Sequence, residues 1–116
     1  MDIERLEEDG VTVVVVRGVI RLGESAERFS RFLQEVLSSG SGPVIIDLEA
    51  IDNVDSTGLG ELVGHLQRFE EQGRRLAFVN PAPRIQKLFA LTRLDQVIPL
   101  YPNRSGAVAE LGADSD

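Results

Sequence analysis

Short apolar runs alternate with segments of helical spacing along most of the chain, and this alternation restricts the fold more than any other feature. The runs at residues 13–16, 44–48 and 76–79 are rich in aliphatic side chains and predict strands that are buried between other elements. The segments that follow repeat apolar residues every three or four positions, which is typical of amphipathic helices. The pattern therefore predicts an α/β fold with right-handed helical crossovers between parallel strands.

Helix and turn signals mark the remaining elements. Gly73 is suited to end a helix and Pro83 to begin one. The run at residues 97–100 is expected to be a weak edge strand, because its proline has no N–H to donate. Residues 3–6 and 12–16 flank an acidic turn and predict an N-terminal antiparallel hairpin, which makes the sheet mixed. Four helices are expected, centred on residues 26–37, 59–69, 83–89 and 107–111.

Length and composition limit the domain count and the kinds of partner. We expect one domain at residues 1–111, followed by a short acidic tail at residues 112–116 that is disordered. The net charge of −7 repels phosphate backbones and argues against binding to nucleic acid. The chain has no cysteine, and no apolar run approaches the roughly 20 residues that span a membrane. We therefore expect a cytoplasmic protein that binds another protein and does not insert into membranes.

The most distinctive segment, residues 55–60, reads Asp-Ser-Thr-Gly-Leu-Gly. It follows the 44–48 strand and a seven-residue acidic loop, and it opens the second helix. Sites in open α/β sheets gather at the carboxyl ends of strands, which is where this loop leads. Gly58 and Gly60 are poor choices for a first helical turn, since each costs about 1 kcal/mol relative to alanine. A partner surface that approaches closely would explain them.

This hexapeptide resembles the signature of anti-sigma-factor antagonists of the STAS family. The order of strands and helices from about residue 10 to residue 111 is also similar to STAS domains, as is the Asn-Pro-Ala-Pro sequence at residues 80–83. The resemblance implies a mixed, mostly parallel sheet with an N-terminal antiparallel hairpin strand and about four packed α-helices. It also implies that a partner kinase phosphorylates the second hydroxyl residue of the motif, Thr57, with Ser56 as the fallback acceptor.

The function that the resemblance implies is partner switching. The unmodified chain would bind an anti-sigma factor that is a GHKL-type serine-threonine kinase, and a sigma factor would be released. Phosphorylation adds about 1.5 to 2 negative charges and would eject the partner, and a phosphatase would reverse it. The chain itself would be no enzyme and would hold no cofactor or metal. The expected partner-binding residues are Arg21, Asp55, Ser56, Thr57, Gly58, Leu59, Gly60 and Glu61.

Arg21 departs from the family pattern. Family members often carry an acidic residue after the glycine-x-hydrophobic turn that follows the second strand, but here residues 18–20 precede an arginine. A positive charge at this rim would change which partner docks, or would engage the phosphate.

Several features also have a purely structural explanation. One of Asp55, Ser56 and Thr57 is expected to cap the second helix, because short oxygen-bearing side chains satisfy its free N–H groups. His65, the only histidine, is expected to be a partly buried structural imidazole. The acidic residues between Asp47 and Asp55 lack the spacing of a calcium loop and are expected to form a solvated rim.

Three alternative functions remain open at the level of the sequence. A STAS subunit of a lipid ABC transporter would use the same surface without being phosphorylated, and a STAS component of a stressosome-like complex would form a large assembly. A phosphoaspartate receiver would use Asp47 or Asp55 as its acceptor. Receivers need an acidic pair after the first strand, and residues 17–21 do not supply one.

Overall fold

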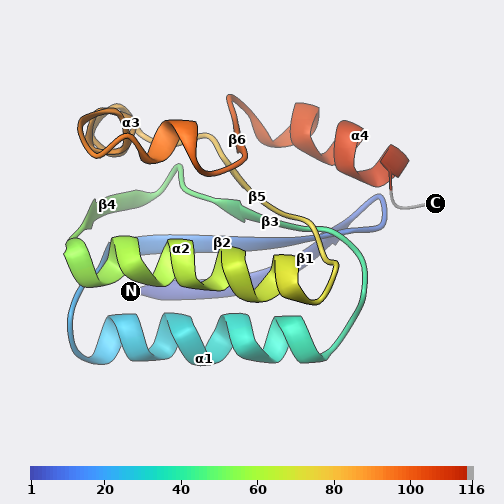
Figure 1. Ribbon diagram of the computed structural model, residues 1–116, viewed down its shortest axis with the longest axis horizontal. Helices are drawn as coiled ribbons and strands as arrows, with labels where there is room; N and C mark the ends of the chain where they lie inside the picture. Colours follow the sequence, from blue (N-terminus) through green and yellow to red (C-terminus); the bar gives the residue numbers. More distant parts are fainter. Residues whose placement is uncertain (115–116) are drawn as a thin grey trace.

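A six-stranded mixed sheet organises the protein in the computed structural model, which describes residues 1–114 (Figure 1). The strands are β1 (Asp2–Glu8), β2 (Val11–Ile20), β3 (Val44–Asp47), β4 (Ile51–Val54), β5 (Leu76–Val79) and β6 (Leu100–Tyr101). The helices are α1 (Glu24–Ser38), α2 (Ser56–Glu71), α3 (Pro83–Leu91) and α4 (Arg104–Asp114), with a short 3-10 helix, η1 (Leu94–Gln96), after α3.

The strand order confirms the predicted fold class. The sheet runs β1-β2-β3-β5-β6, with β1 antiparallel to β2 and the other pairs parallel. β2 is long enough to pair with two strands in succession. Its first half pairs with β3, and after a shift of register at Gly18 its second half pairs with β4. The carboxyl ends of β2 and β4 therefore lie side by side.

Two layers of helices explain the unbroken apolar run in β2. Val14 and Val16 belong to the larger core cluster, to which α1 and α2 contribute Phe29 and Phe69. Val13 and Val15 point into a second cluster, which α4 closes with Ala107, Val108 and Leu111. In Figure 1, α1 lies below the strands and α4 lies above them, while α2 overlaps β1 and β2 in this view. Alternate residues of a strand face opposite sides of the sheet. Because helices cover both sides of β2, the valines on each side are buried, and an unbroken apolar run results.

The helix predictions are confirmed in their positions and faces. The residues of α1 that are buried are those whose spacing predicted the helix: Ala26, Phe29, Leu33, Val36 and Leu37. Pro83 occupies the first turn of α3. Gly73, with φ of 71°, takes the left-handed conformation expected just beyond α2.

Three details of the secondary structure were predicted wrongly. The acidic loop at residues 49–55 contains strand β4, which has only two buried residues, at its ends, and so lacked a strand pattern. The edge strand expected at residues 97–100 begins only at Leu100, because η1 precedes it and leaves Val97 62% exposed. Helix α4 continues to Asp114, three residues into the segment expected to be a disordered tail. Residues 115–116 lie outside the described part.

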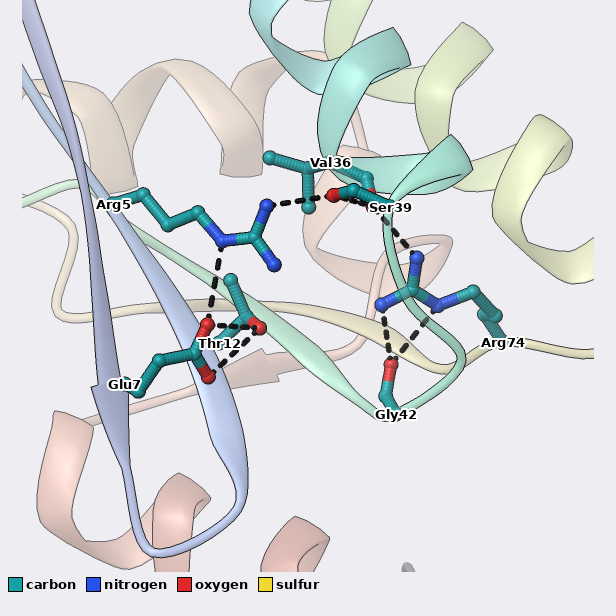
Figure 2. Close-up of polar contacts among 7 residues, drawn as sticks. All are labelled: Arg5, Glu7, Thr12, Val36, Ser39, Gly42 and Arg74. Carbon is teal, nitrogen blue, oxygen red and sulfur yellow. Dashed lines mark hydrogen bonds and ion pairs between the residues drawn. The ribbon is translucent and has the colours of Figure 1, made fainter.

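A buried arginine ties the amino ends of the parallel strands to α1 (Figure 2). Arg74, only 6% exposed, donates to the backbone carbonyls of Val36 at 2.8 Å, Leu37 at 3.0 Å and Gly42 at 2.8 and 3.0 Å. These bonds satisfy carbonyls at the C-terminal end of α1, where a positive charge is favourable. The side chain of Arg5 on β1 also donates to Oγ of Ser39, which joins the N-terminal hairpin to the loop after α1.

Candidate functional site

The start of α2 is built by Asp55, which lies between β4 and the helix. Its Oδ1 accepts the backbone N–H of Gly58 at 2.8 Å, and its Oδ2 accepts the backbone N–H of Leu22 at 2.9 Å. The N–H of Asp55 itself donates to the carbonyl of Ile20 at 3.2 Å. The helix cap is therefore the carboxylate and not a hydroxyl, and it joins the β2–α1 loop to the first turn of α2.

The electrostatic environment keeps this carboxylate charged. Backbone N–H groups of Leu22 and Gly58 lower the pKa of Asp55 below its ordinary value, and the positive charge of Arg21 lowers it further. Asp55 is exposed to solvent. The site therefore presents a fixed negative charge immediately before the two hydroxyl residues.

The two hydroxyls are left available because Asp55 does the capping. Ser56 is exposed and Thr57 is partly exposed. Within residues 1–114, neither hydroxyl makes a hydrogen bond to another protein group. Thr57 lines a groove of about 320 Å³ between α1 and the start of α2, with Glu61 one turn further along the helix. Thr57 therefore lies, partly exposed, in the wall of this groove.

The two glycines of the motif have different explanations. Gly58 is buried, and a Cβ there would lie 2.5 Å from Cγ1 of Val54 and 2.6 Å from the carbonyl oxygen of Ile20. The fold itself requires this glycine, so a partner surface is not needed to explain it. Gly60 is exposed, and a Cβ added there would have no atom within 4 Å. Internal packing does not explain Gly60, and a close partner surface at that residue stays a prediction.

His65 is a buried structural residue that lies beside Glu61. Its side chain is fully buried, more than predicted, with Nε2 at 3.3 Å from Oε2 of Glu61 and Nδ1 at 3.3 Å from the Arg68 guanidinium. Because Arg68 donates, Nδ1 accepts, and the network assigns the proton to Nε2. Burial lowers the pKa of His65, and Arg68 lowers it further against the opposing effect of Glu61. The edge of the imidazole also packs against Phe29, with ring centroids 5.8 Å apart.

The remaining predicted residues lie around this centre. Arg21 is exposed at the rim, and its backbone N–H donates to Oγ of Ser25 at 2.9 Å. Leu59 is half-buried and packs against the larger core cluster, so only part of it faces outward. The structure thus brings Arg21, Asp55 and Thr57 to one edge of the sheet, as the motif predicted for the last two.

One residue of this edge was missed at the level of the sequence. Leu22 is 76% exposed and is bonded through its backbone to Asp55. The available signal was an apolar residue beside Gly23 in the loop after a buried strand.

The acidic segment before α2 is not wholly a solvated rim. Asp47 is only 5% exposed, accepts the N–H of Glu49 at 3.0 Å, and pairs with Arg104 at 3.2 Å. Arg104 also pairs with Glu8 at 2.8 Å. Among the described residues, no three histidine, cysteine or acidic side chains are arranged to hold a metal ion. Asp47 therefore supports the packing of α4, and a role for it as a phosphoryl acceptor is not favoured.

No helix in the described part of the chain combines the length and the apolar character needed to cross a membrane.

Comparison with known proteins agrees with this geometry. A Thermotoga maritima protein, described as a candidate anti-sigma factor antagonist, is 28% identical over 89 residues, covering 76% of this chain and 79% of that protein. An anti-sigma factor antagonist from Mycobacterium paratuberculosis has the same fold, with a TM-score of 0.81, 25% identity and coverage of 95% of this chain and 92% of that one.

The fold is also that of SpoIIAA, a Bacillus cell fate determinant solved in its phosphorylated form. The TM-score is 0.71 at 17% identity, over 94% of this chain and 98% of that one. The model of the STAS domain matches residues 2–107. The chain therefore belongs to the STAS domain family.

Proposed function

We propose that this protein is an anti-sigma-factor antagonist. In the unmodified state it binds an anti-sigma factor that is also a GHKL-type serine-threonine kinase, and a sigma factor is released in the cytoplasm. Phosphorylation of Thr57 ends the binding, and a phosphatase restores it. The observation that carries this proposal is a partly exposed Thr57 hydroxyl at the start of α2, freed from capping because Asp55 caps the helix.

The chemistry divides between the two proteins. The γ-phosphorus of ATP held by the kinase forms a bond with Oγ1 of Thr57, its bond to the β-phosphate bridging oxygen breaks, and ADP leaves. The hydroxyl proton passes to a base on the kinase. This chain supplies the acceptor and the docking surface, while the nucleotide and magnesium belong to the kinase.

Charge accounts for the switch. The positive N-terminal end of α2 favours a phosphate on Thr57, so the modified chain stays folded. The new charge adds to those of Asp55 and Glu61 at the same edge. A partner that docks against the unmodified edge then meets repulsion and the desolvation of a dianion.

The names of the relatives support this proposal. Relatives with the same fold are called anti-sigma factor antagonists, and one of the structures is a phosphorylated form. The resemblance of residues 55–60 to the hydroxyl motif of the family extends that support to Thr57.

The test is a labelling reaction with the GHKL-type kinase encoded nearest to the gene for this chain, ATP and magnesium, followed by mass spectrometry of the modified peptide. We expect one phosphate on Thr57, none in Thr57→Ala, and normal labelling in the matched variant Ser56→Ala. Undiminished labelling of Thr57→Ala would contradict the assignment to Thr57. Tight binding of the phosphorylated chain to the kinase would contradict the switch.

A further inference from the structure

Leu22 is an exposed leucine on a segment of fixed conformation. Its side chain is 76% exposed, while its backbone N–H is held by Asp55 at 2.9 Å. On its two sides, the N–H of Arg21 is bonded to Ser25, and Gly23 has φ of 109°, which other residues rarely adopt. Because the backbone of this segment is already fixed, less conformational entropy is lost when a partner covers the leucine, which favours its use as a binding anchor.

Leu22 lies at the groove that also contains the phosphoacceptor. The groove of about 320 Å³ has an apolar part, formed by Leu22 and Ala26, and a polar part of mixed charge, formed by Glu27, Ser30, Arg31 and Glu61. Thr57 lines the same space. An aliphatic side chain fits the apolar part, next to the hydroxyl residue that is proposed to be phosphorylated.

We propose that Leu22 is the apolar anchor of the interface with the kinase, which covers it with an aliphatic side chain placed in this groove. The proposal rests on the proposed function, because it assigns the same partner to the same edge. It also names what phosphorylation disturbs. A phosphate on Thr57 projects from the wall of the groove that the partner side chain fills, so Leu22 can no longer be covered.

The test measures the dissociation constant of the full-length chain and the kinase by titration calorimetry. We expect Leu22→Ala to raise the dissociation constant by about tenfold or more, and Leu22→Asp to raise it further. The matched control is Leu91→Asp on α3, since Leu91 is 74% exposed and does not line the groove. Its dissociation constant should equal that of the unaltered chain. Because both leucines are exposed, thermal melts should be unchanged in all three variants.

The outcomes separate this inference from the proposed function. If the unaltered chain binds the kinase and Leu22→Ala binds equally well, the anchor is overturned while the proposed function stands. Equal losses in Leu22→Asp and Leu91→Asp overturn the anchor in the same way. If the kinase neither binds nor labels the unaltered chain, the proposed function is overturned and the anchor with it.

Discussion

The carboxylate of Asp55 accepts the backbone N–H of Leu22 at 2.9 Å and so joins two loops that are 33 residues apart in the sequence. With its other oxygen it caps α2 through Gly58. One side chain thus fixes the segment that carries Thr57 and the segment that carries Leu22. The relative position of the two halves of the proposed docking surface depends on this carboxylate.

Replacing Asp55 should therefore destabilise the fold and disturb the site together. We expect Asp55→Ala to lower the melting temperature by several degrees at neutral pH, because two backbone N–H groups lose their acceptor. The matched control is Asp52→Ala on β4, an exposed carboxylate, which should change little. An unchanged melting temperature for Asp55→Ala would show that water replaces the carboxylate at no cost.

The pH dependence of this effect has a definite sign. The pKa of Asp55 in the folded chain is below its ordinary value of 3.8, so the folded state binds fewer protons than the unfolded state. The stabilisation is then fully present above about pH 3.8 and is lost as the pH falls through the lower folded value. Melting curves of Asp55→Ala and the unaltered chain should approach each other in this acidic range and stay apart at higher pH.

The two motif glycines should respond in opposite directions to alanine. Gly58→Ala places a methyl group 2.5 Å from Val54 and 2.6 Å from the backbone of Ile20, which should cost about 1–3 kcal/mol of stability. Gly60→Ala meets no atom within 4 Å and should stabilise the helix by about 0.5–1 kcal/mol. Urea unfolding of both variants gives the comparison, and equal signs would contradict it. In kinase binding, Gly60→Ala should weaken the complex in spite of its greater stability.

Much of the fold and part of the site followed from residue patterns. Val13–Val16 and the spacing of α1 specify which faces are buried, and local chemistry at residues 55–57 predicts that one of these three side chains caps α2 without specifying which one. Strand β4 was missed because its pairing with the second half of β2 depends on a register shift at Gly18, a contact between distant residues. The need for glycine at position 58 depends on the nearby carbonyl of Ile20, and the position of Leu22 depends on its bond to Asp55. Both contacts join residues that are distant in the sequence, so neither could be predicted from a local pattern.

The buried guanidinium of Arg74 should contribute more to stability than an exposed ion pair. Arg74→Met keeps the apolar volume near Phe69 but removes the donor to the carbonyls of Leu37 and Gly42, which should cost about 2–3 kcal/mol. The carbonyl of Val36 keeps its bond from the N–H of Ser39. The matched control is Arg17→Met, which removes an exposed ion pair to Glu4 and should cost less than about 1 kcal/mol. Equal losses in urea unfolding would show that the carbonyls find water in the variant.

His65 offers a direct view of the interior of α2, because it is the only histidine and its imidazole signals in NMR spectra need no assignment. Its pKa lies below the ordinary value of 6.5, mainly through burial, so the ring should titrate below that pH. The neighbours set the direction of further shifts. Glu61→Gln should lower the midpoint, because it removes the charge that raises the pKa, and Arg68→Gln should raise it.

The same shift links His65 to stability. The folded state binds the proton less readily than the unfolded state, so stability is complete above about pH 6.5 and decreases as the pH falls from there toward the folded midpoint. A midpoint above 6.5 would mean that the folded state binds the proton more readily than the unfolded state. The charge of Glu61 would then raise the pKa by more than burial lowers it. In that case the sign of the stability change would also reverse, so NMR titration and unfolding curves check the same claim independently.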